Sequence, residues 1–246
     1  MIRLLDVQKS FAGRAVLDGL SLEIPEGQTT VILGHSGSGK SVTLKLIVGL
    51  LTPDAGRVEV DGATVHELDA DALAAMRGTI GYVFQFAALF DSMTVADNLR
   101  LGLVRRGMDE REMQRRVDES LALVGLAASA DRFPAELSGG MRKRAGIARA
   151  IALRPRYILY DEPTTGLDPV TSASIDQLMV RTRDLGGTGV VVTHDLRSAF
   201  TVGDRIAMLH RGRIRQVGTV AEMQASEDPV VRQFLEGRPD PAEAGV

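Results

Sequence analysis

The 246-residue chain contains no cysteine, which excludes disulfide bonds and cysteine-ligated zinc. No apolar run approaches the length that spans a bilayer, and the first residues, MIRLLDVQKS, lack the long apolar core of a signal peptide. The formal net charge is −3, so a broad, sequence-independent grip on nucleic acid is not favoured. We therefore expect a cytoplasmic chain that has no nucleic-acid partner and that reaches a membrane only through another protein.

The hydrophobic share of 44% is enough for a core, and its pattern predicts an α/β fold. RLLDV and AVLDGLSLEI alternate apolar and polar residues, as half-buried antiparallel strands do. TTVIL is short, continuous and β-branched, which predicts a strand buried on both faces, and TIGYVFQ predicts a strand that ends at Gln85. Helical signals fill Val95 to Leu153, and strands return in YILYDEP, GVVVTHD, RIAMLH and RIRQVG. The sequence thus predicts a mostly parallel α/β core interrupted by a helical insert.

The stretch GHSGSGKS, from Gly34 to Ser41, fits the phosphate-binding pattern G-x-x-x-x-G-K-[ST]. Its glycines allow the backbone N–H groups to wrap around phosphates, Lys40 would neutralise the outer phosphates, and the Ser41 hydroxyl would ligate Mg²⁺. The alternative is a glycine-rich turn that binds nothing. The position between a buried-type strand and a helix favours the phosphate site.

Two adjacent acids follow a hydrophobic strand in YILYDEP. Asp161 is placed to hold a metal ion, and Glu162 could polarise an attacking water. The alternative is a pair of solvent-exposed acids at a strand end, which is the common fate of such residues. His194 lies just past the strand GVVVT, where it is either incidental or close to the γ-phosphate.

Six elements occur in order: the phosphate loop, Gln85, LSGGM at Leu137–Met141, LYDEP, TGLDP and THD. This set resembles the ATP-binding cassette (ABC) family over nearly the whole chain. The resemblance implies an α/β P-loop NTPase (RecA-like) core with an antiparallel β subdomain and a helical insert. It also implies one nucleotide-binding domain over 1–246, with a core of 1–85 and 156–220, a helical subdomain of 86–155 and a C-terminal tail of 221–246.

The resemblance assigns a role to each matched residue, with ATP and Mg²⁺ as the bound groups. The catalytic residues would be Glu162, His194 and Gln85, and the metal ligands Ser41, Gln85 and Asp161. The nucleotide-binding residues would be Phe11, Gly34, His35, Ser36, Gly37, Ser38, Gly39, Lys40, Ser41, Val42, Ser138, Gly139, Gly140 and Asp168. Phe11 would stack on adenine, although it could instead be an ordinary turn aromatic.

In this family two cassettes pair head to tail, so the phosphate loop of one copy and the LSGGM segment of the other hold one ATP. Ser138 can cap a helix, and Gly139 and Gly140 permit close backbone approach. The basic run Arg142–Arg144 would add positive potential, or would only be a solvated face. Met141 stands where relatives often have glutamine, so that side chain cannot make the same hydrogen bonds. We expect the partner to be a second copy of this chain.

A transporter ATPase is the leading class within the family. Phe86, Leu89, Phe90 and Met93 would suit a groove for a short helix of a membrane permease, or would pack into the insert's own core. The rivals are an ATPase that imports another solute, such as an amino acid, and a soluble assembly or regulatory ATPase without a permease.

Three segments, ALFDSMTVADN, LSGGMRKRAGIARAIAL and DPVVRQFLEG, look like the Mla-type, Mce-associated ATPases. That resemblance implies phospholipid transport at the cytoplasmic face of the inner membrane. The partners would be a permease, an Mce-domain lipid-binding protein and a small STAS-domain subunit. Val230, Val231, Phe234 and Leu235 would line one side of a terminal helix, which we expect to dock on a neighbouring subunit.

Overall fold

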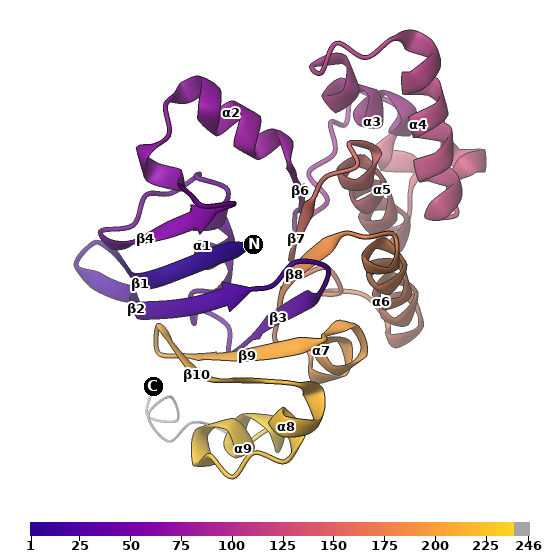
Figure 1. The fold of residues 1–246 in the computed structure, drawn as a ribbon. Coiled ribbons are helices and arrows are strands. Elements are labelled where there is room, and N and C mark those ends of the chain that lie inside the picture. Colours follow the sequence, from indigo (N-terminus) through magenta and orange to yellow (C-terminus); the bar gives the residue numbers. More distant parts are fainter. Residues whose placement is uncertain (239–246) are drawn as a thin grey trace. The chain divides into compact units, whose positions relative to one another are not determined.

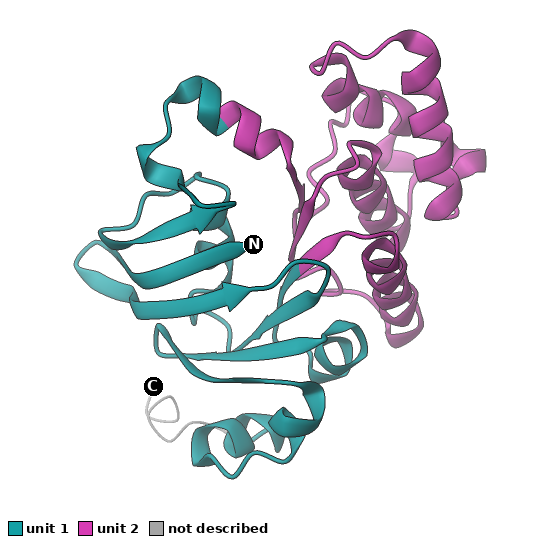
Figure 2. Cartoon of the chain, viewed as in Figure 1, with its two compact units in different colours: residues 1–73, 190–246 teal, residues 74–189 magenta. Residues whose placement is uncertain are grey.

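The computed structural model describes residues 1–238, and the chain divides into two compact units (Figure 2). Unit 1 contains residues 1–73 and the chain from residue 190 onward, and unit 2 contains residues 74–189. The subdomain bounds expected from the sequence are drawn on a different basis and stay a prediction.

Unit 1 contains an antiparallel sheet in the order β2-β1-β4-β5 (Figure 1). Ile2 of β1 is paired with Ile24 of β2 on one side and with Val60 of β4 on the other. Ile2, Leu4, Val7, Leu20 and Leu22 are buried while Asp6 and Ser21 between them are exposed, which confirms the alternation of half-buried strands. The strands are β1 (Ile2–Phe11), β2 (Arg14–Ile24), β4 (Ala55–Val60) and β5 (Ala63–Thr64).

The second group of strands in unit 1 runs in the order β10-β9-β3-β8, with Val190–Thr193 of β8 belonging to this unit. All five residues of β3 are buried, as the continuous apolar run predicted, and β3 pairs in parallel with β9 from Thr30 to Leu33. The elements are β3 (Thr29–Leu33), α1 (Lys40–Ile47), η1 (Val65–Glu67), β8 (Thr188–Thr193), α7 (Leu196–Val202), β9 (Arg205–His210), β10 (Arg213–Gly218), α8 (Val220–Gln224) and α9 (Pro229–Leu235).

Unit 2 contains the parallel strands β6 and β7 and most of the helices. Helix α5 packs against α3, α4, α6 and β6, so it lies at the centre of this unit. The elements are α2 (Ala70–Gly78, which crosses the boundary of the units), β6 (Ile80–Val83), α3 (Val95–Val104), α4 (Glu110–Leu123), η2 (Ala127–Ser129), η3 (Pro134–Glu136), α5 (Gly139–Ala152), β7 (Tyr157–Asp161) and α6 (Pro169–Asp184).

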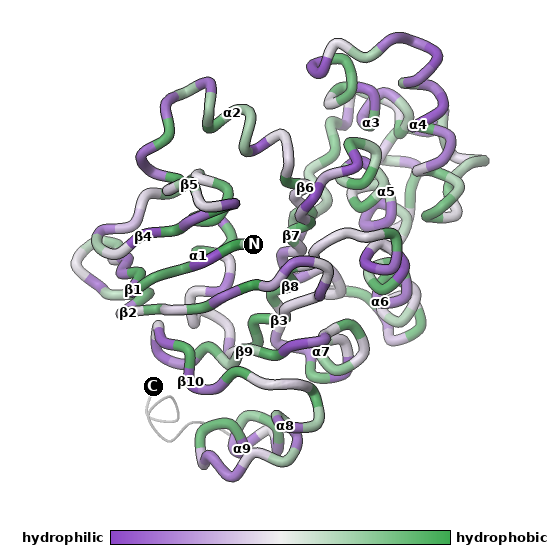
Figure 3. The backbone as a smooth tube through the Cα atoms, in the orientation of Figure 1, coloured by the Kyte–Doolittle hydropathy of each residue, from purple (hydrophilic) through white to green (hydrophobic). Residues whose placement is uncertain are grey.

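Helix α4 has the expected amphipathic character. Much of it is coloured hydrophilic in Figure 3, while Met113, Val117 and Leu121 are buried on one face. Asp109 caps its N-terminus by accepting the amide of Glu112. The mixed α/β architecture, with an antiparallel sheet and a helical part, confirms the predicted fold class.

Two expectations need correction. Strand β6 ends at Val83, and Gln85 lies in the following turn, which is closed by the Ala87 amide donating to the Phe84 carbonyl (3.0 Å). The terminal helix buries Val231 and Phe234 within this chain, so two of the four apolar residues expected to dock on a neighbour are already covered. Within residues 1–238, no helix is long and apolar enough to cross a bilayer.

Candidate functional site

The Gly34–Ser41 loop follows the buried strand β3 and leads into α1 within unit 1. Gly39 has φ 104°, and a Cβ there would lie 2.6 Å from Leu17 Cδ2. A Cβ on Gly34 would lie 2.5 Å from the carbonyl oxygen of Leu209. Only glycine fits at positions 34 and 39, so steric contacts explain why the motif has glycine at both.

The Lys40 side chain is buried in the concave side of this loop. Its Nζ donates to the carbonyl oxygens of Gly34 and His35, at 2.9 Å each. The amide of Ser38 also donates to the His35 carbonyl (3.3 Å), while the buried Ser38 Oγ has no hydrogen-bond partner among the described residues. Among the described residues the buried Ser38 hydroxyl has no acceptor, and phosphate oxygens are acceptors for both a hydroxyl and an ammonium. The loop therefore fits a nucleotide phosphate chain.

The other predicted residues of unit 1 are accessible. Phe11 is exposed at the end of β1, and the Lys9 ammonium lies 5.6 Å from its ring centroid. Ser36 is exposed, and Ser41 and Val42 are half-buried in the first turn of α1. His194 is exposed directly after β8, and the next residue, Asp195, caps α7.

In unit 2, Asp161 is the buried last residue of β7. The Tyr82 hydroxyl of β6 donates to its Oδ2 at 3.0 Å, and burial together with the Asp161 charge raises the pKa of the Tyr82 hydroxyl. Tyr82 therefore stays protonated and fixes one oxygen of Asp161. No motif in the sequence marks Tyr82, although its position near the end of the β6 strand is visible in IGYVFQ.

Glu162 is also buried, and it is held in a left-handed backbone conformation (φ 48°), which is rare for a side chain of this kind. Thr165 Oγ1 donates to its Oε2 (2.9 Å), and the buried Lys143 ammonium donates to its carbonyl oxygen (3.3 Å). Burial lowers the pKa of Lys143, and the neighbouring charges of Glu162 and Asp161 oppose this shift. The exposed acid pair considered as an alternative is therefore wrong.

The LSGGM segment begins α5 in unit 2. Ser138 caps the helix by accepting the Met141 amide (3.3 Å), as expected, and Ser138 and Gly139 are exposed. A Cβ on Gly140 would lie 2.5 Å from Thr171 Cγ2. Thr171 Oγ1 in turn donates to Asp168, which caps α6, and this hydroxyl is the main cause that lowers the pKa of Asp168.

The basic run after this segment does not form one positive surface. Lys143 is buried as described, Arg144 donates to the Val124 carbonyl (3.0 Å), and the exposed Arg142 donates to the Leu137 carbonyl (2.6 Å). Each cation is bound to a backbone oxygen within unit 2. The solvated-face interpretation holds for the exposed Arg142 but not for the buried Lys143.

The segment from Phe86 to Met93 presents its aromatic residues to solvent. Phe86 is 86% exposed and Phe90 51% exposed, while Leu89 and Met93 are half-buried. The alternative that all four pack into the core of the insert is therefore wrong for the two phenylalanines. The half-buried Gln85 directly precedes this segment.

Two residues that the sequence analysis did not identify hold this segment in place. The fully buried Asn98 accepts the Phe90 amide (2.7 Å) and donates to the carbonyl oxygens of Phe90, Met93 and Thr94. Arg149 of α5 donates to the carbonyl oxygens of Ala87 and Ala88.

The predicted metal ligands belong to different units, Ser41 to unit 1 and Gln85 and Asp161 to unit 2. Within residues 1–238 no group of three or more His, Cys, Asp or Glu could hold a metal by itself. The joining of all these residues in one site stays a prediction.

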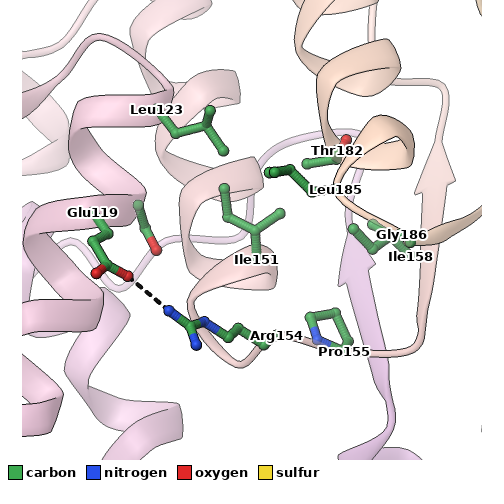
Figure 4. A pocket seen from close by; sticks show the side chains of 11 residues that line it. Glu119, Leu123, Ile151, Arg154, Pro155, Ile158, Thr182, Leu185 and Gly186 are labelled. Atoms are coloured by element: carbon green, nitrogen blue, oxygen red, sulfur yellow. Dashed lines mark hydrogen bonds and ion pairs between the residues drawn. The ribbon is translucent and has the colours of Figure 1, made fainter.

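A cavity of about 570 Å³ lies elsewhere in unit 2 (Figure 4). Leu123, Ile151 and Ile158 give it apolar walls, and the Glu119–Arg154 ion pair (2.9 Å) lies beside them. None of the predicted site residues lines it.

The chain matches a known protein family and is similar in sequence to several known proteins. The family described as ABC transporter matches residues 17–165. The probable ribonucleotide transport ATP-binding protein mkl of Mycobacterium tuberculosis is 44% identical over 233 residues, 94% of this chain. The chain spans 65% of the length of that relative. The methionine import ATP-binding protein MetN 2 of Pseudomonas entomophila is 42% identical over 243 residues, covering 96% of this chain and 72% of the relative.

Solved structures share the fold. A dimeric, post-hydrolysis state of the ATP-binding cassette MJ0796 bound to ADP and Pi matches with a TM-score of 0.82 and 36% identity. This match covers 89% of this chain and 99% of that one. The cbiO1 protein of Clostridium perfringens, part of the transporter complex cbiONQ, matches with a TM-score of 0.84 and 28% identity over 95% of this chain and 94% of that one.

Proposed function

This chain belongs to the ABC transporter family as an ATPase domain, and on that premise we propose that its Gly34–Ser41 loop binds ATP whose hydrolysis drives transport. The observation that carries the proposal is the pairing of the buried Lys40 ammonium with the Gly34 and His35 carbonyl oxygens, beside the unpaired Ser38 hydroxyl. An ammonium on carbonyl oxygens is a weaker arrangement than an ammonium on phosphate oxygens. Lys40 would therefore exchange these partners for phosphate oxygens.

Different groups of the loop would hold the phosphates. Backbone N–H groups of the loop and the N-terminal end of α1 would face the phosphates, and Lys40 would neutralise the outer charge. Bound Mg²⁺ would supply further positive charge there, with Ser41, Gln85 and Asp161 as the protein ligands. Phe11, exposed at the end of β1, would provide an aromatic face for the adenine.

Glu162 is the residue that we assign to activation of the attacking water. Its carboxylate accepts from Thr165, and its carbonyl from Lys143, so both its ends are fixed within unit 2. A fixed carboxylate can orient a water without first reorganising. His194 would contact the γ-phosphate or the same water.

A second copy of the chain would complete the site. Ser138 and Gly139 are exposed at the beginning of α5, where the helix has its positive end. The dimeric form of the related cassette MJ0796 supports pairing of two copies. Closure of the pair can do work only to the extent that nucleotide binds the closed pair more tightly than the open one.

The Glu162→Gln variant tests this mechanism. It keeps the size and the Thr165 contact but removes the carboxylate charge, so turnover should fall about a hundredfold or more, in the range of lost general-base catalysis. ATP and Mg²⁺ should then trap the pair as a stable dimer in size-exclusion chromatography. Glu110→Gln, at an exposed position of α4, is the matched control. Turnover near the native rate in Glu162→Gln would show that another residue activates the water.

For the cargo, we propose phospholipid or another envelope lipid, moved through a permease with an Mce-domain protein and a STAS-domain subunit at the cytoplasmic face of the inner membrane. The support is the resemblance of three segments to Mla-type ATPases. The names of the relatives favour a second candidate, import of a small solute, because they refer to ribonucleotide and methionine transport.

The exposed Phe86 and Phe90 would form the contact with the permease. Affinity purification from native membranes, followed by protein and lipid identification, tests partner and cargo together. A permease with an Mce-type protein and bound lipid supports the lipid cargo, whereas a solute-binding protein supports the second candidate. Phe86→Ser with Phe90→Ser should lose the permease, and Leu185→Ser, at a residue 74% exposed elsewhere in unit 2, should retain it.

A further inference from the structure

The C-terminal helix α9 contacts the nucleotide-binding loop through a pair of aromatic rings. The rings of Phe234 and His35 meet edge to face, with centroids 4.7 Å apart and an interplanar angle of 82°. Phe234 is only 8% exposed, so this ring is enclosed by the chain. Both residues belong to unit 1.

His35 is the residue whose backbone organises the loop. Its carbonyl oxygen accepts both the Lys40 ammonium (2.9 Å) and the Ser38 amide (3.3 Å). A rotation at His35 would therefore move the oxygen that positions the phosphate-binding lysine. The contact between the His35 and Phe234 rings holds the His35 side chain in place and so restrains this rotation of the His35 backbone.

Helix α9 is itself firmly attached to unit 1. Asp228 caps it by accepting the amides of Val230 and Val231, and its other oxygen pairs with Arg215 of β10 at 2.7 Å. Val231 is fully buried. Strand β10 pairs with β9, and β9 pairs with β3, which leads into the loop. The loop is thus held at its start by β3 and at the His35 ring by α9.

We infer that Phe234 is a positioning residue for nucleotide binding: through the His35 ring it holds the Gly34–Ser41 loop in the form that accepts the phosphates. This inference rests on the proposed function of that loop. A loop that is already ordered loses less conformational freedom when it binds, so removing the restraint should weaken nucleotide affinity. The strength of aromatic pairs predicts a loss of about three- to tenfold.

The test measures the Kd of ADP by titration calorimetry on the full chain. Phe234→Leu keeps an apolar side chain in place but removes the ring, and His35→Ala removes the other partner. Each should raise the Kd about three- to tenfold, and the double variant should bind no more weakly than the weaker single one, because both changes remove the same contact. Phe234→Tyr keeps the ring and should bind ADP as the unmodified chain does.

Two controls separate this inference from its premise. Arg232→Ala changes an exposed residue of α9 and should leave the Kd unchanged. Lys40→Ala should abolish ADP binding, and failure of the unmodified chain to bind ADP would overturn the proposed function. ADP binding by Phe234→Leu with the Kd of the unmodified chain, or additive losses in the double variant, would overturn the inference about Phe234 alone.

A kinetic readout distinguishes positioning from general damage to the fold. Loss of loop order should raise the KM for ATP about three- to tenfold and leave kcat nearly unchanged, because Glu162 is untouched. A fall in kcat at unchanged KM would contradict the inference. Far-UV circular dichroism and the thermal midpoint would establish that Phe234→Leu remains folded.

Discussion

Replacement of Asn98, the single asparagine of the chain, should loosen the segment that presents Phe86 and Phe90. Its fully buried side chain accepts the Phe90 amide at 2.7 Å. Its amide nitrogen lies 3.1, 3.3 and 2.9 Å from the carbonyl oxygens of Phe90, Met93 and Thr94. One side chain thus ties the segment before α3 to the first turn of that helix.

The cost of removing this side chain follows from the hydrogen bonds. An asparagine amide has two N–H donors and one carbonyl acceptor, so at most three bonds of ordinary strength are lost in Asn98→Ala. At about 0.5–1.5 kcal/mol each, the free energy of unfolding should fall by about 2–4 kcal/mol. Asn98→Asp should cost at least about 1 kcal/mol more than alanine, because a buried carboxylate would face carbonyl oxygens that it cannot donate to.

Urea unfolding followed by circular dichroism measures the loss, and hydrogen exchange at the Phe90 amide localises it. Gln114→Ala removes an exposed amide that donates to Asp118 and accepts from Arg100, both at the surface, and should change stability by no more than about 0.5 kcal/mol. An Asn98→Asp variant more stable than Asn98→Ala at pH 7 would refute the assignment of donors and acceptors. Unchanged exchange at Phe90 would refute the anchoring role.

Two further predictions concern other parts of the chain. Gly140→Ala should destabilise unit 2 by about 1–3 kcal/mol, because the added methyl group would overpack against Thr171 Cγ2. Adding Thr171→Ser removes that methyl group of Thr171 but keeps its hydroxyl. The double variant should therefore recover most of the lost stability in thermal melts. Arg215 is the main cause that lowers the pKa of Asp228 below its ordinary value of about 3.9. Because the pKa of Asp228 is lower in the folded chain, its ionised carboxylate stabilises α9 at pH values above the ordinary pKa, and this stabilisation is lost as the pH falls through the folded-state pKa. Acid should therefore release α9, which hydrogen exchange of the α9 amides would detect. Asp228→Asn should show no such acid-dependent release.

The sequence predicted the features that depend on local pattern. The buried run TTVIL became β3, the spacing of Met113, Val117 and Leu121 became one face of α4, and Ser138 became a helix cap. Each of these follows from side-chain period or from backbone groups within a few residues. The phosphate loop was predicted from its motif, whereas the contacts with Leu17 and Leu209 that require glycine at positions 39 and 34 come from distant segments.

Contacts between segments that are distant in the chain could not be predicted from the sequence. Tyr82 meets Asp161 only because β6 and β7 are neighbours, and no local pattern gives the order of strands. The pairing of Phe234 with His35 is of the same kind. Lys143 is different, since it lies four residues before the buried Ile147 on α5, and its helical face could have indicated burial.

Helix α5 carries Ser138 and Gly139 at its beginning and contacts Glu162 through Lys143, so it connects two predicted parts of the site within unit 2. Ser138 and Gly139 lie exposed at its beginning, and one turn later the Lys143 ammonium holds the carbonyl of Glu162. The left-handed conformation of Glu162 is then maintained from both sides, by Lys143 at its carbonyl and by Thr165 at its carboxylate, which is how a strained residue keeps one orientation.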